Sequence, residues 1–126
     1  MRPNDYWEEL AATGATSEVS ITFIAEFEGR PVGTLGVRLL DVGTAELVSP
    51  WVEPLARRRG TGPSLIDAAV HWARERGCSA LEAWVRAETE DARETYASYG
   101  FVDVDHVSGE AATSAARVRM RLAIAD

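Results

Sequence analysis

The sequence predicts a single domain, residues 1–126, of the mixed α/β (α+β) class. A β-rich first half is followed by runs of apolar residues with helical spacing that alternate with further β-rich runs. The composition is that of a globular chain with a core, since 46% of the 126 residues are hydrophobic and 26% are charged. No internal repeat or low-complexity tract interrupts this pattern. One folded unit is therefore expected.

The first half of the chain predicts a short helix and three strands. A helix from Asp5 to about Ala12 would place Tyr6, Trp7 and Leu10 on one side. Runs rich in β-forming residues then predict strands at 20–27, 32–39 and 44–52, the first two joined as a hairpin. Pro50 lies inside the third of these strands and cannot donate a hydrogen bond to a neighbour. A bulge or a splayed edge is therefore expected near Pro50.

The second half predicts two helices and three strands. Apolar residues recur at helical spacing after Pro63, and Gly77 is a suitable helix end, so a helix is expected over 62–77. A second helix is expected over 91–99, where Gly100 ends it. The remaining β-rich runs predict strands at 81–86, 101–107 and 117–124, and the small polar residues 108–116 predict a loop.

Composition also excludes several classes of function. A net charge of −7 opposes binding to nucleic acid, which requires a broad basic face. Cys78 is the only cysteine and the chain has two histidines, so neither a disulfide nor a metal site is expected. The chain contains no lysine, which excludes a phosphate-loop lysine. No apolar run is long enough to cross a membrane, so a cytoplasmic protein is expected.

The segment RRRGTGPS, residues 57–64, is the strongest functional signal. Adjacent arginines repel one another, and Gly60 and Gly62 add backbone entropy that folding must remove. A glycine-containing loop that leaves a strand and enters a helix directs several N–H groups toward the helix start, where the helix dipole also favours an anion. Pro63 is compatible with a helix start. The segment therefore predicts a phosphate-binding loop.

With its surroundings, this loop resembles the acyl-CoA pyrophosphate loop of the GNAT superfamily of N-acyltransferases, written [QR]-x-x-G-x-[GA]. Arg57, Gly60 and Gly62 occupy the motif positions, and the segments WARERG and YASYGF follow in the order found in the family. The resemblance implies a mostly antiparallel central sheet with helices on both faces. It also implies acetyl-CoA as co-substrate, no catalytic metal, and direct transfer of the acetyl group to a primary amine of a small molecule or protein.

The resemblance implies roles for individual residues. The main chain of Trp51 and Val52 would pair with the pantetheine arm, and Tyr96 would be the general acid. The other implied cofactor-binding residues are Arg57, Arg58, Arg59, Gly60, Thr61, Gly62, Ser64, Thr89 and Ala92. Thr89 stands where members usually carry asparagine. The alternative is a non-catalytic acyl-CoA-binding or interaction module of the same fold.

The base is less determined than the acid. Glu46 occupies the position on the fourth family strand where some members carry a catalytic glutamate. Glu82 is a weaker substitute, and a chain of water molecules is the third possibility. Cys78 follows the far end of the helix that begins at the phosphate loop, about 22 Å away for fifteen residues. A cysteinyl intermediate is therefore disfavoured.

Members of this superfamily usually begin with a strand and two helices. Only about twenty residues precede the first predicted strand here, so the family's first strand and one helix are expected to be missing. The outer edge of strand 20–27 would then be bare and apolar, and it would invite pairing. A homodimer that covers this edge and completes the acceptor pocket is therefore expected.

Overall fold

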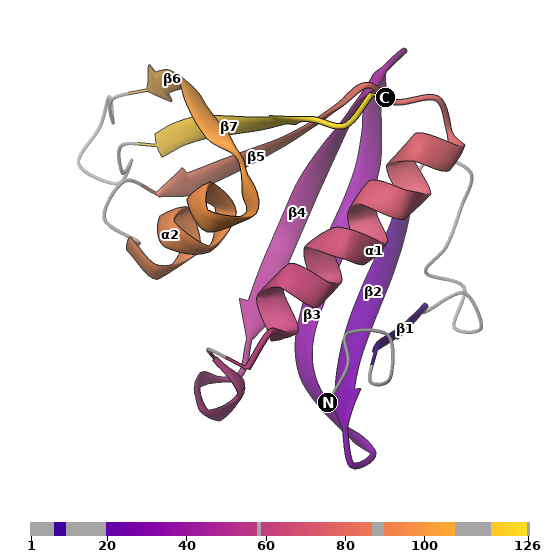
Figure 1. Ribbon diagram of the computed structural model, residues 1–126, viewed down its shortest axis with the longest axis vertical. Coiled ribbons are helices and arrows are strands. Elements are labelled where there is room, and N and C mark those ends of the chain that lie inside the picture. Colours follow the sequence, from indigo (N-terminus) through magenta and orange to yellow (C-terminus); the bar gives the residue numbers. More distant parts are fainter. Residues whose placement is uncertain (1–6, 10–19, 58, 87–89, 108–116, 126) are drawn as a thin grey trace.

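The computed structural model describes residues 7–9, 20–57, 59–86, 90–107 and 117–125. Its strands form one sheet in the order β1-β2-β3-β4-β5-β7-β6 (Figure 1). The β4·β5 pair is parallel and every other neighbouring pair is antiparallel. The strands are β1 (Trp7–Glu9), β2 (Ser20–Phe27), β3 (Arg30–Asp41), β4 (Thr44–Val52), β5 (Ala80–Arg86), β6 (Val102–Val107) and β7 (Arg117–Ala123).

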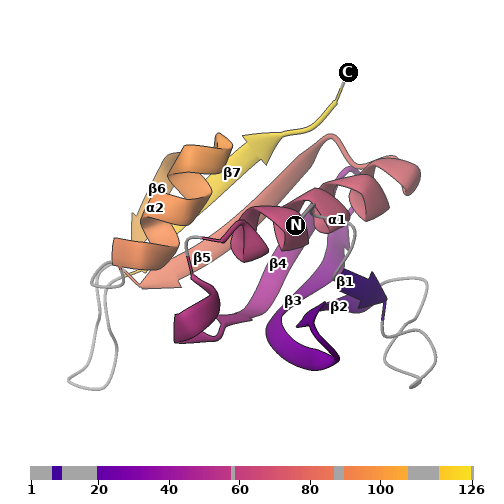
Figure 2. The same ribbon diagram turned by 60° about the horizontal axis from the view of Figure 1, so that its bottom comes forward.

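The two described α-helices lie on the same face of this sheet (Figure 2). They are α1 (Thr61–Glu75), which crosses β2, β3 and β4, and α2 (Glu90–Tyr99), which lies near β6 and β7. A short 3₁₀ helix, η3 (Pro54–Ala56), leads from β4 toward α1. The predicted mixed, mostly antiparallel sheet is confirmed. Within the described residues both helices lie on one face, and a helix on the second face stays a prediction.

The core lies between the helices and the sheet. Strand residues alternate between the two faces, so β2 directs Ile21, Phe23 and Ala25 toward α1 and buries them almost completely. From α1, Leu65, Ile66, Ala69 and Trp72 pack into the same cluster. The apolar positions that predicted the helix are therefore the positions that cover the sheet. No described helix is long and apolar enough to cross a membrane.

The N-terminal prediction is wrong. Residues Trp7–Glu9 form β1 rather than part of a helix, and they pair antiparallel with β2, with Trp7 opposite Ala25 and Glu9 opposite Phe23. A strand therefore stands where the family's first strand was expected to be missing. The N–H and C=O groups at the edge of β2 pair with this short segment, for which helical spacing alone had predicted a helix. The bare edge that motivated the homodimer is covered at these positions, and the homodimer itself stays a prediction.

Strand β4 contains a bulge where it pairs with β3, next to the point where β4 and β5 diverge. Gly36 lies opposite Val48 and Thr34 opposite Trp51, so Ser49 and Pro50 together face one residue of β3. Ser49 takes a left-handed backbone, with φ of 50°. The parallel pairing of β4 with β5 ends at Leu47 and Ala83, although both strands continue. The predicted bulge near Pro50 is confirmed, and a splay between β4 and β5 begins beside it.

Candidate functional site

A cleft of about 700 Å³ opens beside this splay, on the helix side of the sheet. Its walls come from β3, β4, the loop before α1, and α1 and α2 themselves. Seven of the predicted site residues line it: Trp51, Val52, Arg57, Gly60, Gly62, Ala92 and Tyr96. Residues about forty positions apart in the sequence therefore meet in one cleft, as the predicted cofactor site requires.

The start of α1 supplies hydrogen-bond donors to this cleft. Gly60 is the N-cap residue with φ of 83°, a left-handed conformation in which glycine is favoured. Helix geometry leaves the N–H groups of Thr61 and Gly62 without partners inside the helix. A Cβ atom on Gly62 would lie 3.1 Å from Cγ2 of Thr95, so this position also allows α2 to approach closely. The loop has the geometry of an anion site.

Pro63 is the third residue of α1, whereas in a helix over 62–77 it would be the second. Its missing N–H is still harmless there, because the first turn of a helix has no acceptors for these groups. Ser64 follows, and its N–H donates to the carbonyl oxygen of Gly60 at 3.0 Å. This backbone hydrogen bond therefore joins Gly60 of the loop to the first turn of α1.

Not every predicted loop residue reaches the cleft. Thr61 and Ser64 are buried, and their hydroxyl groups donate to the carbonyl oxygens of Ala56 and Gly60. The Ser64 hydroxyl thus stabilises the loop, and the role of Ser64 in binding pyrophosphate stays a prediction. Arg59 is exposed and lies outside the cleft lining. The predicted residues Arg58 and Thr89 lie outside the described part of the chain.

Tyr96 has the surroundings of a proton donor. It lines the cleft from α2, it is 4% exposed, and its ring contacts Phe101 with centroids 5.1 Å apart. Burial raises the pKa of its hydroxyl to about 12, because the charged phenolate is poorly solvated there. The hydroxyl therefore keeps its proton at neutral pH. A group that stays protonated and faces the cleft can act as a general acid.

Sequence reasoning missed a second tyrosine in the cleft wall. Tyr99 donates a hydrogen bond from its hydroxyl to Oδ1 of Asp67 on α1, and so ties α2 to α1. Burial and this carboxylate raise the pKa of Tyr99 above its usual value. Asp67 and Tyr99 lie 32 positions apart, and no local pattern links them. Only the packing of the two helices could have identified the pair.

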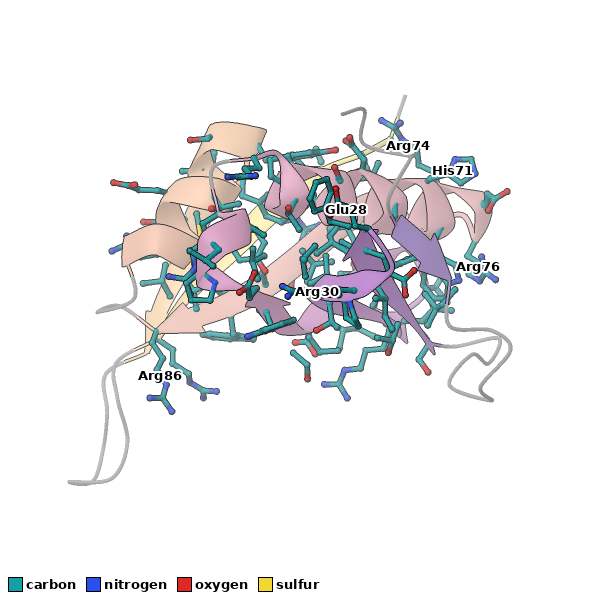
Figure 3. The ribbon with its side chains drawn as sticks, turned by 90° about the horizontal axis from the view of Figure 1, so that it is seen from below. Glu28, Arg30, His71, Arg74, Arg76 and Arg86 are labelled. Carbon is teal, nitrogen blue, oxygen red and sulfur yellow. The ribbon has the colours of Figure 1, made fainter. Side chains whose placement is uncertain are left out.

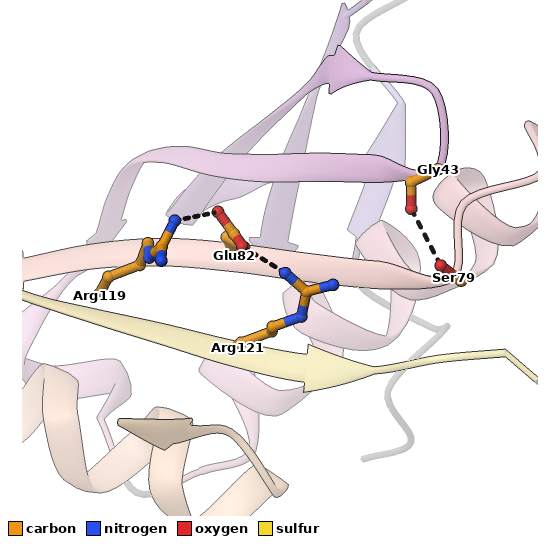
Figure 4. Close-up of polar contacts among 5 residues, drawn as sticks. All are labelled: Gly43, Ser79, Glu82, Arg119 and Arg121. Atoms are coloured by element: carbon orange, nitrogen blue, oxygen red, sulfur yellow. Dashed lines mark hydrogen bonds and ion pairs between the residues drawn. The ribbon is translucent and has the colours of Figure 1, made fainter. Parts of the chain in front are cut away.

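Glu46 lies on the other side of the sheet, and we call this side, opposite α1 and α2, the open face. Arg38 of β3 donates from Nε to Oε1 of Glu46 at 2.8 Å, and its second nitrogen lies 2.6 Å from the same oxygen. Glu82 is the neighbour of Glu46 in the β4·β5 register. Figure 4 shows Glu82 between Arg121, 2.7 Å from Oε2, and Arg119, 3.5 Å from Oε1.

Cys78 lies far from the cleft. It follows the C-terminal end of α1, whereas Gly60 precedes the other end, and it is 5% exposed. Burial, with a contribution from Asp41, raises the pKa of the Cys78 thiol and disfavours the thiolate. Within the described residues no cluster of His, Cys, Asp and Glu has the arrangement of a metal site.

Comparison with known proteins identifies the family. Residues 2–101 match the Acetyltransferase (GNAT) family. An uncharacterised N-acetyltransferase of Methanocaldococcus jannaschii is 33% identical over 93 residues, which cover 69% of this chain and 41% of that protein. The matched region thus spans less than half the length of that relative.

Solved structures share the fold. Ard1 from Thermoplasma volcanium superposes with a TM-score of 0.77 at 23% identity, covering 83% of this chain and 71% of that one. The protein yncA of Salmonella typhimurium, solved with its cofactor acetyl-CoA, gives a TM-score of 0.71 at 20% identity, with 85% and 66% covered. These structures share the fold of this chain, and because the family match covers residues 2–101, the chain belongs to the GNAT family of acetyltransferases.

Proposed function

We propose that this protein transfers the acetyl group of acetyl-CoA directly to a primary amine. One observation carries the proposal: the loop at Gly60 and the general-acid candidate Tyr96 line the same cleft. The N–H groups of Thr61 and Gly62 would bind the pyrophosphate, with Arg57 close enough to offset its charge. At Trp51 and Val52 β4 still pairs with β3 but no longer with β5, and the edge left open toward β5 would hold the pantetheine arm and direct an N–H to the thioester oxygen.

The proposed reaction has one bond formed and one bond broken at the acetyl carbon. The neutral amine attacks the thioester carbonyl, a C–N bond forms, and the C–S bond breaks with its electron pair leaving on sulfur. The thiolate takes a proton from the Tyr96 hydroxyl, and the amine loses a proton to a base. The rate gain comes from holding the amine and the thioester in line. Buried Cys78, beyond the far end of α1, takes no part.

Glu46 is the base in this proposal, although its contacts leave Glu82 and water as alternatives. Glu46 and Leu47 are the last residues of β4 that pair with β5, so the Glu46 carboxylate lies where the splay begins. The contacts of Glu46 with Arg38 use one carboxylate oxygen, Oε1, whereas both oxygens of Glu82 contact arginines. Within the described residues, Oε2 of Glu46 is therefore the carboxylate oxygen of this pair that contacts no arginine. Its position on the open face implies that the amine approaches from there, since CoA would fill the helix side.

A single assay tests this proposal and its non-catalytic alternative. The protein is mixed with acetyl-CoA and a panel of primary amines, and CoA thiol release is followed together with product mass. Enzyme-dependent formation of an acetylated amine supports transfer. Binding of acetyl-CoA, seen as a rise in melting temperature, without product from any amine would favour a binding module. The absence of both would reject the cofactor assignment.

A further inference from the structure

We infer that the acceptor amine also carries an anionic group, in the simplest case a carboxylate, and that arginines of the open face bind it. This inference deepens the proposed function and rests on it for the position of the reacting amine. Its basis is a set of five arginines that we call the arginine patch. Its members are Arg38 on β3, Arg86 on β5, and Arg117, Arg119 and Arg121 on β7.

The sheet register places the patch on one face. Arg38 lies opposite Glu46, Glu82 lies opposite Arg121, and Trp84 lies opposite Arg119. Val118 and Met120, the residues between the β7 arginines, are buried in the core, so the arginines point away from it. Figure 3 shows Arg86 on the side of the sheet away from the helices. The patch therefore lies on the face from which the amine is proposed to approach.

The charge of this face differs from that of the whole chain. The described carboxylates that contact the patch are Glu46 and Glu82, against five arginines. Asp105 of β6 stands opposite Arg119 in the register. The whole chain carries −7. A positive patch on an acidic chain attracts anions and repels amines whose remaining charge is positive.

Trp84 organises the centre of the patch. The guanidinium carbon of Arg117 lies 5.1 Å from the centroid of the Trp84 ring, and that of Arg119 lies 5.9 Å from it. Stacking on an aromatic ring holds a guanidinium plane while its N–H groups can still donate, and this fork matches a carboxylate. Trp84 is the first residue of β5 beyond the paired region, so the stack borders the splay.

The spacing also fits. Strand β7 is the neighbour of β5 in the sheet, and adjacent strands lie about 5 Å apart. An amine in the splay between β4 and β5 can therefore extend a carboxylate a few carbon atoms away to Arg117 or Arg119. A simple alkylamine would make no such contact. A diamine would bring a second cation against them, at a cost in free energy.

Three acceptors with the same reactive amine test this inference: 4-aminobutyrate, butylamine and 1,4-diaminobutane. The expected order of kcat/KM is 4-aminobutyrate, then butylamine, then the diamine. A hydrogen bond to a charged group is worth about 1.5–3 kcal/mol, so the first step in that order is expected to be about tenfold or more. The preference should shrink as salt rises. Equal rates, or a preference for the diamine, would overturn the inference.

A pair of matched variants assigns any preference to the patch. Arg117→Gln removes a guanidinium stacked on Trp84, and Arg76→Gln removes one stacked on Trp72 at 4.1 Å, at the far end of α1 (Figure 3). Both variants lose one positive charge. The ratio of kcat/KM for 4-aminobutyrate over butylamine should fall in Arg117→Gln and hold in Arg76→Gln. Equal ratios in the two variants would contradict the assignment.

A binding measurement separates this inference from the proposed function. Titration calorimetry with CoA present compares the products 4-acetamidobutyrate and N-butylacetamide. Tighter binding of the carboxylate product, lost in Arg117→Gln, supports the patch even if no amine is acetylated, in which case the transfer proposal alone fails. Equal binding of the two products together with measurable transfer would reject the patch and leave the transfer proposal standing.

Discussion

The two faces of the sheet are built from the same strands but hold different kinds of side chain. Toward the helices, β4 and β5 direct Ala45, Leu47, Leu81 and Ala83, all buried in the core. Toward the open face they direct residues such as Glu46 and Glu82, whose carboxylates contact arginines. The helix face offers backbone donors at Gly60 for an anionic cofactor. The open face offers charged side chains, which suit an acceptor that is recognised by charge.

In the proposed function, this difference places the cofactor and the acceptor on opposite faces of the sheet. The proposed cofactor site depends on the backbone of one loop, so it should tolerate changes of side chain but not of glycine. The acceptor side depends on side chains from β3, β4, β5 and β7, so single substitutions there should alter specificity before they alter the fold. The splay between β4 and β5 connects the faces, and the reaction is proposed to occur there.

The largest effect is expected from Gly60→Asp. The substitution places a side chain and a negative charge where the pyrophosphate approaches, at a residue with φ of 83°. Acetyl-CoA at 100 times its Kd should stabilise the wild-type protein by about 2.7 kcal/mol, a rise of several degrees in Tm, and in the variant this rise should vanish.

Gly29→Asp is the control for Gly60→Asp. Gly29 has a similar φ of 79° in the β2–β3 turn, and a Cβ atom there would have nothing within 4 Å. The variant shares the backbone strain and the charge change, so it should keep the Tm rise with acetyl-CoA. A rise retained in folded Gly60→Asp would place the pyrophosphate elsewhere.

Tyr96→Phe tests the helix-face acid. Because a positioned acid contributes roughly 10²- to 10⁴-fold, kcat should fall about 10²-fold while acetyl-CoA affinity stays nearly unchanged. Since burial raises the pKa of Tyr96 to about 12, its proton is lost only in strongly alkaline solution, so it should cause no decline in wild-type rate at ordinary assay pH. Steady-state kinetics with calorimetry would show the split; an unchanged kcat would make Tyr96 a packing residue.

Glu46→Gln tests the open-face base. At neutral pH kcat/KM is expected to fall about tenfold. This loss is smaller than that for Tyr96→Phe because the amine can also lose its proton to water. The residual rate should climb with pH as the free amine accumulates. A pH profile of kcat/KM measures this. Glu82→Gln serves for comparison, and a larger change of profile in that variant would move the base to β5. An unaltered profile in both would favour a water chain.

The smallest effect is expected from Tyr99→Phe and Asp67→Asn, which each break the bond between α1 and α2. A partly exposed hydrogen bond of this kind contributes about 1 kcal/mol, so denaturant unfolding should show a loss of that size. The KM for acetyl-CoA should rise by only a few fold, because the cleft wall shifts rather than disappears. A double variant no worse than either single variant would show that the two residues act as one contact.

Local chemistry made much of the fold predictable. The predicted ranges 20–27 and 44–52 are the observed β2 and β4, and the helix predicted over 62–77 is observed at Thr61–Glu75. The bulge follows from Pro50, and the anion loop follows from Gly60 and Gly62. These features depend on residues near one another in the sequence. The segment at Trp7–Glu9 failed because its strand exists only through pairing with β2.

Local patterns in the sequence were enough to predict the order of α-helices and strands from β2 onward, the loop that opens α1, and through these the family. Each rests on backbone preferences and apolar spacing, which act within a few residues. Three contacts were found only in the folded chain. Ser64 donates to the loop carbonyl of Gly60, Tyr99 donates to Asp67, and Arg117 and Arg119 of β7 stack on Trp84. The physical reason is register: a shift of one residue would send each strand side chain to the other face, and no local pattern encodes which residues of β5 and β7 lie opposite one another.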